Sequence, residues 1–375
     1  MKNHIYADNA ATTKLDPEAF ETMKPWLLEE YGNASQLYSF ARKPKKALAE
    51  ARATIASCIN ALPEEIFFTS GGTESDNWAI KGSAFSDSEH RATITSAFEH
   101  HAVLRSCAAI ERLGYPVAYL SPTPDGQITP KNLESVITDN TRLVSIMFAN
   151  NEIGSIQPIK ELCAVAHAHG ALFHTDAVQA VGHIKIDVQE LGVDMLSASA
   201  HKFNGPKGIG FLYIRKGVEL PAYEDGGSQE SGRRAGTENV ALIVGMATAL
   251  KNNCKQMEHN QAHVVAMEKQ LLRGLTEFGL KFIRNGGGNT LPGLISLSFP
   301  NKDGEAILHR LDLMGISIST GAACDSVNTQ ISHVLQSIGL SKNYLKGTIR
   351  ISIGNNNTDE DIIAIVEALK KLLLS

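Results

Sequence analysis

The chain has 375 residues, of which 43% are hydrophobic and 20% are charged, so it is long for a single core and two domains are expected. Its formal net charge of −5 argues against direct binding of nucleic acid or of an anionic membrane. The N-terminus lacks an apolar signal segment and no run approaches the roughly 18 apolar residues of a membrane span, so we expect a cytoplasmic protein.

Short β-rich runs alternate with helical patterns in the first two thirds of the chain. The runs occupy 65–70, 92–98, 142–149, 171–175, 194–199 and 209–214, and helical patterns follow the first three from about residues 73, 100 and 158. Strands separated by helices predict an α/β fold with a mainly parallel sheet that has helices on both faces. Ligands of such sheets bind beyond the carboxyl ends of the strands, so the residues that follow each strand are the first candidates for a site.

The last third of the chain has a different pattern. A long helical stretch from about 237 to 278 precedes short strands and helices, and a closing helix begins at Thr358 with three acidic residues in its first turn. This pattern predicts a smaller α+β domain. We place the boundary near 255–260, with a large domain at 14–257 and a small domain formed by 1–13 and 258–375.

Lys202 follows the strand-like run at 194–199 and precedes three glycines. An arbitrary lysine is usually solvated, but the context favours a function here. Ser199 and His201 offer short polar groups beside the amine, and the glycines allow backbone to approach a ligand closely. A partly desolvated lysine loses proton affinity and can form a Schiff base with an aldehyde.

Asp176 comes directly after the run at 171–175, and Gln179 stands three residues further on. By itself Asp176 is as well explained as a helix cap. Combined with a Schiff-base lysine it indicates pyridoxal phosphate (PLP), whose ring nitrogen stays protonated beside a buried carboxylate. Gln179 is then suited to donate a hydrogen bond to the phenolic oxygen of the ring.

Three further positions follow predicted strands. Gly72 and Thr73 open a helix after 65–70, which predicts a phosphate site made of backbone N–H groups, a hydroxyl and the helix dipole; an N-cap role for Thr73 is compatible with it. His100 has an imidazole that can stack on a flat ring and move protons. Asn151 can hydrogen-bond the same ring.

The segments TSGGTESDN, AFEHHAV, NNEIG, HTDAVQAVG, SAHKFNGPKGIG, GRRAGTENV and GAACDS occur in the order and approximate spacing of NifS/IscS-type cysteine desulfurases. The chain resembles that family from residue 6 to residue 354. The resemblance implies the class V aminotransferase-like fold type I, with a mainly parallel seven-stranded-type sheet and a smaller C-terminal domain.

The resemblance also assigns roles to single residues. It implies that Lys202 is the Schiff-base lysine, Asp176 the pyridinium partner, Gln179 the phenolate contact, and His100 the stacking proton carrier. It implies that Asn151 contacts PLP, and that the phosphate ligands are Gly72, Thr73, Ser199 and His201. Thr237 matches a threonine that reaches the cofactor of the partner subunit, which implies a two-fold homodimer. Asn33 and Arg350 match the residues that bind the substrate carboxylate, and a guanidinium suits that task.

Cys324 is the cysteine without apolar periodicity around it. The resemblance implies that it attacks the sulfur of a substrate L-cysteine, so that L-alanine is released and Cys324 carries a persulfide for an acceptor protein. Small neighbours on a mobile loop suit a thiol that must enter a pocket and then leave it. The five cysteines show no CxxC spacing, so we expect neither disulfides nor a metal site.

The chain departs from the family pattern at two places, beside Cys324 and at 355–357. Asp325 lies beside the nucleophile and would oppose thiolate formation. The triplet 355–357 is Asn-Asn-Asn where many relatives have a basic turn, which we expect to affect the mouth of the substrate site. The chain stops soon after the closing helix, and the acceptor is open among iron–sulfur cluster assembly, tRNA thiolation and DNA phosphorothioation.

Other functions remain as alternatives. A cysteine-sulfinate or selenocysteine lyase, or an aminotransferase-like enzyme, would keep Lys202 and Asp176 but would not need Cys324. A binding module without catalysis is a third hypothesis, against which the lysine, the aspartate and the phosphate site all argue. A Rossmann dehydrogenase or a zinc enzyme finds no matching fingerprint.

Overall fold

The computed structural model describes residues 4–320 and 331–374. Its largest feature is a seven-stranded sheet in the order β2-β8-β7-β6-β5-β3-β4. The strands are β2 (Ile66–Thr69), β3 (Ala92–Ser96), β4 (Val117–Leu120), β5 (Thr141–Ser145), β6 (Leu172–Asp176), β7 (Met195–Ser199) and β8 (Gly210–Ile214). Strands β3 to β7 pair in parallel, and β8 runs antiparallel to both β7 and β2. The sheet is therefore mainly parallel, as the alternating pattern predicted.

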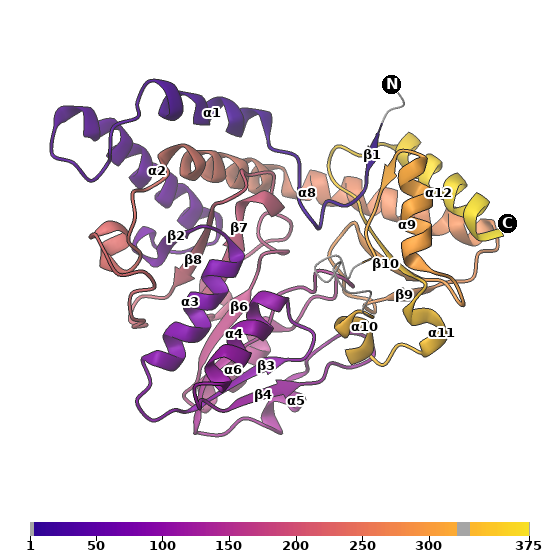
Figure 1. Ribbon diagram of the computed structural model, residues 1–375, viewed down its shortest axis with the longest axis horizontal. Helices are drawn as coiled ribbons and strands as arrows, with labels where there is room; N and C mark the ends of the chain where they lie inside the picture. The colour runs from indigo at the N-terminus through magenta and orange to yellow at the C-terminus, as the bar shows by residue number, and fades with distance from the viewer. Residues whose placement is uncertain (1–3, 321–330, 375) are drawn as a thin grey trace.

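Helices cover both faces of this sheet (Figure 1). They are α1 (Pro17–Leu28), α2 (Arg42–Cys58), α3 (Gly72–Phe85), α4 (His101–Glu111), α5 (Pro130–Glu134), α6 (Ile159–Ala168), α7 (Val188–Leu191) and α8 (Val240–Glu277). Alternation along each strand sends side chains to two cores. In β5, Leu143 packs with α3 and α4, whereas Val144 belongs to the core shared by α2, α6 and the first half of α8.

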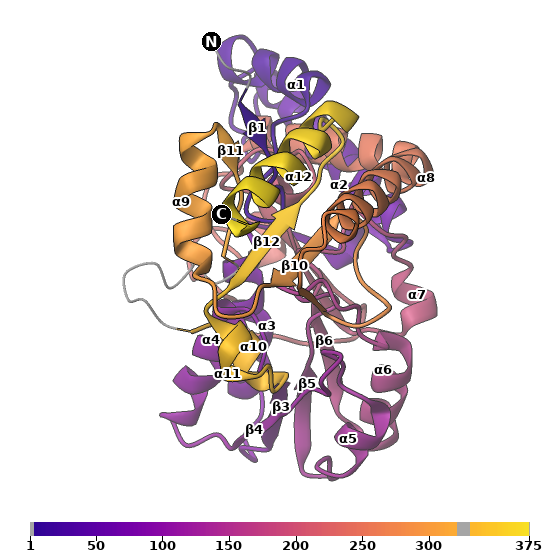
Figure 2. The same cartoon turned by 90° about the vertical axis from the view of Figure 1, so that its right-hand side faces the viewer.

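The C-terminal third builds a separate antiparallel sheet in the order β12-β10-β9, from β9 (Ile283–Asn285), β10 (Leu294–Ser298) and β12 (Thr348–Ser352). A short parallel pair joins β1 (Ile5–Tyr6) to β11 (Ile316–Ser317). The remaining helices are α9 (Gly304–Leu313), α10 (His333–Ser337), α11 (Lys342–Leu345) and α12 (Asp359–Leu374). Seen from this end of the molecule, α9 and α12 lie beside β12 (Figure 2).

A second core belongs to this C-terminal unit. Its apolar side chains come from β10, β12, α9, α12 and the second half of α8. The predicted stripe of the closing helix is confirmed, because Ile362, Ile365, Val366, Leu369 and Leu373 are all buried. Helix α8 continues without a break through 255–260, where we expected a domain boundary, and contributes to both cores. The division into 14–257 and 1–13 with 258–375 stays a prediction.

None of the helices in the described ranges combines the length and the apolarity that a membrane span requires.

Candidate active site

Lys202 lies just beyond the carboxyl end of β7, a strand that is buried along its whole length. Its Nζ donates hydrogen bonds to the carbonyl oxygens of Ala10 at 2.6 Å and Ala11 at 2.9 Å. Both carbonyls belong to the segment 8–13, which we call the strap. The strap thus crosses the amine and holds it in a half-buried position at the edge of the sheet.

Asp176 ends the neighbouring strand β6 and is 6% exposed. Its Oδ1 accepts the N–H of Val178 at 2.9 Å. Burial raises the pKa of this carboxyl, while His100, the bond from Val178 and the charge of Lys202 oppose that rise. A buried carboxylate of this kind is best stabilised by a cation placed against it.

His100 precedes α4 and caps it, because its Nδ1 accepts the N–H of Ala102 at 3.1 Å. The proton of the neutral imidazole is therefore assigned to Nε2. Burial lowers the pKa of His100. One side-chain nitrogen or oxygen atom from each of His100, Asp176 and a third residue, Asp76, lies within 4.8 Å of the other two.

Asp76 and His174 are buried groups that the sequence did not single out. Asp76 lies on α3, is 1% exposed, and its Oδ1 is 3.7 Å from His174 Nε2. Burial raises the pKa of Asp76 well above its usual value, and the charge of Asp176 raises it further. Burial lowers the pKa of His174 to about 3. The sequence carried a signal for His174. Residues 172, 174 and 176 share one face of β6, so His174 faces the same way as Asp176.

Two carboxylates and an imidazole at this spacing would also suit a metal ion. However, His100 Nδ1 and Asp176 Oδ1 already accept backbone N–H groups. The absence of a metal from this site stays a prediction.

The start of α3 forms a cradle next to Ser199. Gly71 has a φ of +151°, and no side chain caps the helix that follows it, so the first N–H groups of α3 remain open to an anion. A Cβ at Gly71 would lie 3.3 Å from Ser199 Oγ, and one at Gly72 would lie 2.5 Å from Val178 Cγ2. The close packing accounts for both glycines, and Thr73 is exposed beside them.

The strap also contacts His201 and Gln179. His201 Nδ1 lies 3.1 Å from Thr12 Oγ1, and burial lowers the pKa of this imidazole to about 4. Gln179 Nε2 donates to the carbonyl of Ala10 at 3.0 Å. Ala10 therefore accepts from both Gln179 and Lys202, which places these two predicted site residues side by side.

Arg350 is brought to the same place by β12. It is 3% exposed, and it donates from Nη1 to the Asn151 carbonyl at 2.8 Å and from Nη2 to Asp8 Oδ1 at 2.7 Å. Its Nε has no hydrogen-bond partner among the described residues. Ile349, Ile351 and Ile353 face the core on the other side of the strand, as the alternation in the sequence predicted.

Asn33 and Thr237 come from two other connections of the chain. Asn33 Oδ1 accepts the N–H of Ser35, and Ser35 Oγ lies 3.4 Å from a carboxylate oxygen of Glu238. These residues belong to the connections before α2 and before α8, at the end of the molecule opposite to the small sheet (Figure 1). Thr237 is exposed and lines a hollow with Ser70, close to the α3 cradle. The contacts of Asn33 do not bring it to Arg350, so its role in binding the substrate carboxylate stays a prediction.

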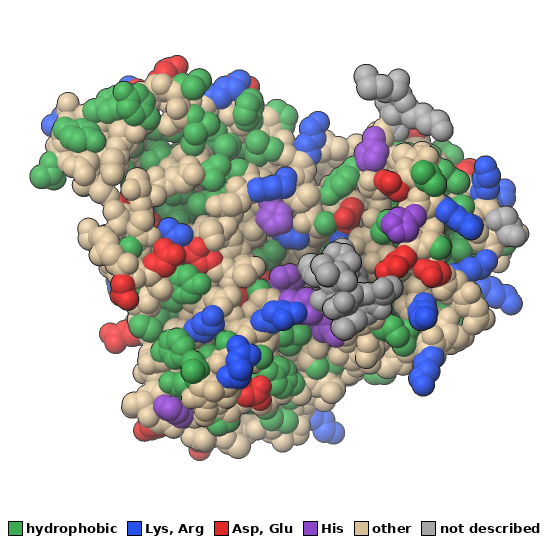
Figure 3. All heavy atoms as spheres, in the orientation of Figure 1, with side chains coloured by type: hydrophobic (Ala, Val, Ile, Leu, Met, Phe, Trp, Pro, Cys, Tyr) green, Lys and Arg blue, Asp and Glu red, His purple; other side chains and the backbone are tan. Residues whose placement is uncertain are grey.

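Cys324 lies outside the described residues, as does Asp325. The residues on either side are anchored at the site. Ser319 exchanges two backbone hydrogen bonds with Arg350, at 2.6 and 3.0 Å, and Ser332 Oγ donates to Glu152 at 2.5 Å. The rings of His101 and His333 are 4.8 Å apart, and a group of histidines is visible in the middle of this face (Figure 3).

Comparisons with known proteins agree with this geometry. The family described as Aminotransferase class-V matches residues 5–365. A curated relative named cysteine desulfurase IscS, from Dictyoglomus turgidum, is 45% identical over 375 residues, which covers 100% of this chain and 95% of the relative. A solved structure of a NifS-like protein shares 36% identity with a TM-score of 0.93, and covers 99% of both chains.

A second solved structure, described as SspA in complex with cysteine, is 38% identical with a TM-score of 0.84, over 94% of this chain and 100% of that one. Similarity at this level extends over the whole fold and is not confined to single motifs. The chain therefore belongs to the Aminotransferase class-V family and, within it, to the enzymes of the NifS/IscS-type cysteine desulfurase group.

Proposed function

We propose that this enzyme removes the sulfur of free L-cysteine with the help of PLP, releases L-alanine and leaves a persulfide on Cys324. The observation that carries the proposal is the edge of the seven-stranded sheet, where the Lys202 amine, the buried Asp176 carboxylate and the His100 imidazole converge. These are the groups that an aldehyde cofactor with a basic ring nitrogen requires.

The donor set fits PLP. Lys202 would hold the aldehyde carbon, and Asp176 would face the ring nitrogen, whose positive charge offsets the cost of burying the carboxylate. The open N–H groups at the start of α3, with Thr73 and Ser199 beside them, would hold the phosphate together with His201. PLP, when bound, supplies an electron sink that allows bonds at the substrate carbons to break.

The protein's own groups then position the substrate and move protons. The Nε of Arg350 has no partner among the described residues, and Asp8 pairs with its Nη2. A substrate carboxylate would accept a hydrogen bond from the remaining N–H group of the guanidinium. His100 carries its proton on Nε2, with Nδ1 fixed by Ala102. A ring fixed in this way can hold a proton at one defined atom and pass it to the substrate.

The sulfur transfer balances without a further reagent. The carbon–sulfur bond of cysteine breaks, a sulfur–sulfur bond forms to Cys324, and the carbon that loses sulfur takes a proton, giving one alanine and one persulfide. The thiolate is the attacking form. Cys324 enters the proposal through the family resemblance, and the anchored flanks at Ser319 and Ser332 support it.

We further propose a homodimer that acts in the cytoplasm and passes the sulfur to an acceptor protein. Large apolar side chains are exposed together around the α1–α2 connection, including Leu28 at 74%, Tyr31 at 72% and Leu37 at 100%. Contiguous exposed apolar residues are typical of an interface. The exposed Thr237 lies in the same region, which supports its proposed contact with the partner's cofactor. The acceptor belongs to iron–sulfur cluster assembly, tRNA thiolation or DNA phosphorothioation.

Three variants test the proposal. Lys202→Ala should lose the yellow absorbance of bound PLP together with all alanine release. Cys324→Ser should keep the absorbance and lose persulfide formation, whereas Lys207→Ala, which changes an exposed neighbour, should keep both. Absorbance, alanine release from L-cysteine and from L-selenocysteine, and mass spectrometry of the persulfide are measured on the same preparations.

Two results would contradict the proposal. A folded Cys324→Ser protein without the PLP absorbance would separate the thiol from its proposed role. Full alanine release from selenocysteine combined with none from cysteine would favour the lyase alternative.

A further inference from the structure

A cavity borders the strap. Its lining comes from the strap, the turn after β6, Asn204, the middle of α8 and the loops at β10 and β12. Its volume is about 60 Å³. Gln179, a predicted PLP contact, is among the residues that line it, so the cavity adjoins the proposed PLP site.

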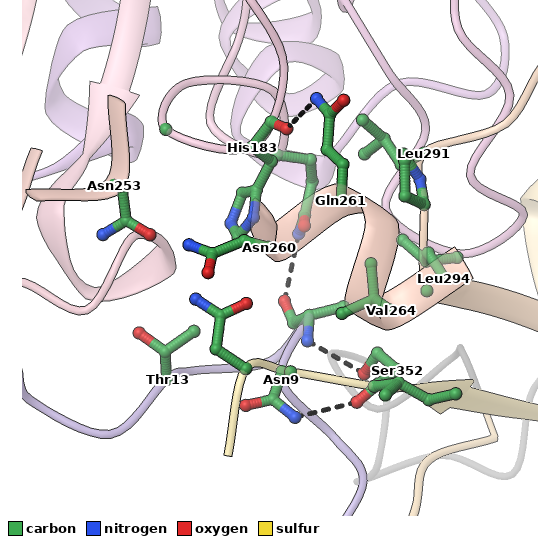
Figure 4. Close-up of a pocket in the computed structure, with 18 of the residues that line it drawn as sticks. Asn9, Thr13, His183, Asn253, Asn260, Gln261, Val264, Leu291, Leu294 and Ser352 are labelled. Carbon is green, nitrogen blue, oxygen red and sulfur yellow. Dashed lines mark hydrogen bonds between the residues drawn. The ribbon is translucent and has the colours of Figure 1, made fainter. Parts of the chain in front are cut away.

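Among the described residues that line this cavity there is no Asp, Glu, Lys or Arg, although 20% of the chain is charged. Its polar groups are mainly carboxamides, including Asn9, Asn260, Gln261 and Asn355, together with the imidazole of His183. Asn355 belongs to the asparagine triplet at 355–357, whose expected effect on the mouth of the substrate site stays a prediction. Leu291 and Leu294 add an apolar wall (Figure 4).

Several of these polar groups keep hydrogen-bonding capacity for a ligand. The Asn260 side chain has no hydrogen bond among the described residues. Gln261 uses its Nε2 to donate to the His183 carbonyl at 2.7 Å, which leaves its Oε1 available. His183 donates from Nε2 to the Lys202 carbonyl at 2.8 Å, so its Nδ1 is an acceptor. Burial lowers the pKa of His183, which keeps the ring neutral.

The chemistry of this lining selects the ligand. A charged molecule would lose its hydration and find no counter-ion, which is costly in a partly buried site. A carboxamide presents an acceptor and a donor side by side, and a hydroxyl group both donates and accepts, so adjacent hydroxyls match a ring of Asn and Gln side chains. The C–H face of such a molecule would pack against Leu291 and Leu294.

We propose that this cavity, which we call the amide cavity, binds a small uncharged polyhydroxy compound of about the size of glycerol. Binding there would reach Lys202 through two short paths. The Ala10 carbonyl accepts both Gln179, which lines the cavity, and the Lys202 amine. His183 holds the Lys202 carbonyl directly. The amide cavity thus offers a site from which an uncharged metabolite acts on the position of the lysine.

The test compares probes that differ in charge. Glycerol and ethylene glycol are titrated into the holoenzyme by ligand-observed NMR and calorimetry, alongside 3-aminopropane-1,2-diol and glycerate. At least one uncharged probe should bind saturably, with a dissociation constant on the order of millimolar for so few atoms. The two charged analogues of glycerol should bind at least tenfold more weakly than glycerol.

Variants locate the binding. Asn260→Leu should weaken binding of the uncharged probe at least tenfold, and Asn260→Asp should make 3-aminopropane-1,2-diol bind more tightly than glycerol. Asn140→Asp, which changes an exposed asparagine elsewhere, should alter neither result. The proposal is overturned if no uncharged probe binds, if glycerate binds as well as glycerol, or if binding survives Asn260→Leu unchanged. Binding is measured directly, so failure of the desulfurase proposal would leave this result readable.

Discussion

Two regions that border the strap differ in their chemistry. The Lys202 amine, which the strap holds, lies near Asp176, and Asp176 is grouped with Asp76 and His100. The described residues that line the amide cavity include no Asp, Glu, Lys or Arg. Buried charges are costly unless they are paired, whereas carboxamides need only hydrogen-bond partners. The comparison indicates that the region around Lys202 needs charges set against one another, whereas the amide cavity needs only hydrogen bonds.

The first prediction places a charge in the lining of the amide cavity. Asn253 is 5% exposed, and its Nδ2 donates to the carbonyls of Phe203 and Ala249. Asn253→Asp would place a carboxylate against two carbonyl oxygens, so we expect the free energy of unfolding to fall by about 3 kcal/mol at pH 7. Urea unfolding monitored by circular dichroism measures the loss.

The pH dependence of that loss has a definite sign. The buried carboxyl would have a pKa above its value in the unfolded chain, so the penalty should shrink as the pH is lowered toward 4. Asn260→Asp, at a half-buried position of the same cavity, is the matched control and should cost much less. Equal losses for the two variants would show that burial of the charge is not the cause.

The second prediction removes an ionisable side chain from the region around Asp176. Glu99 is fully buried, with Oε1 accepting from Ser96 Oγ at 2.5 Å and from the Met147 N–H at 2.9 Å. Burial raises its pKa to about 8. The folded state therefore holds a proton that the unfolded chain releases near pH 4.5, and this group lowers stability as the pH rises from about 4.5 to about 8.

Glu99→Gln keeps an oxygen for both donors and cannot ionise. Its stability should match that of the parent near pH 4.5 and exceed it by about 1–3 kcal/mol at pH 8. Unfolding by urea at a series of pH values measures this difference. Glu305→Gln, an exposed acid on α9, should show no such trend, and a parallel shift at all pH values would argue against a buried proton on Glu99.

The sequence could predict most of the sheet and the residues at its edge. Asp176 and Lys202 were found because each directly follows a buried strand, and parallel strands end at one edge. Strand β4 was missed, since it is a short edge strand with a half-exposed pattern that lacks clear alternation. The long helical stretch predicted at 237–278 matches α8, and the domain boundary that we placed near 255–260 falls within this helix.

Contacts between distant segments could not be predicted from local patterns. The strap touches Lys202 across about 190 residues of sequence, and Asp8 pairs with Arg350 across 342. Asp76 sits on a helix whose sequence gives no reason to expect a fully buried acid. Such contacts depend on tertiary packing, which propensity and periodicity do not encode.

The last prediction concerns a partly exposed histidine paired with a buried aspartate, where solvent should weaken the effect of the charge. His167 Nε2 lies 2.8 Å from Asp194 Oδ2, and this bond, followed by the contact with Cys163, raises the pKa of His167 to about 10. The charged pair stabilises the fold fully below pH 6.5 and loses this contribution as the pH rises toward 10. The His167 side chain is 38% exposed, so solvent screening limits the contribution to about 1 kcal/mol.

His167→Ala should therefore lower the free energy of unfolding by at most about 1 kcal/mol at pH 6, with the difference shrinking by pH 10. His169→Ala is the matched control, because its partner Asp139 is 94% exposed, and we expect no measurable change. A loss at His167 as large as that of Asn253→Asp would mean that exposure does not decide the cost of a charge here. A loss that disappears as the pH rises toward 10 would show that the charged form of His167 supplies the contribution.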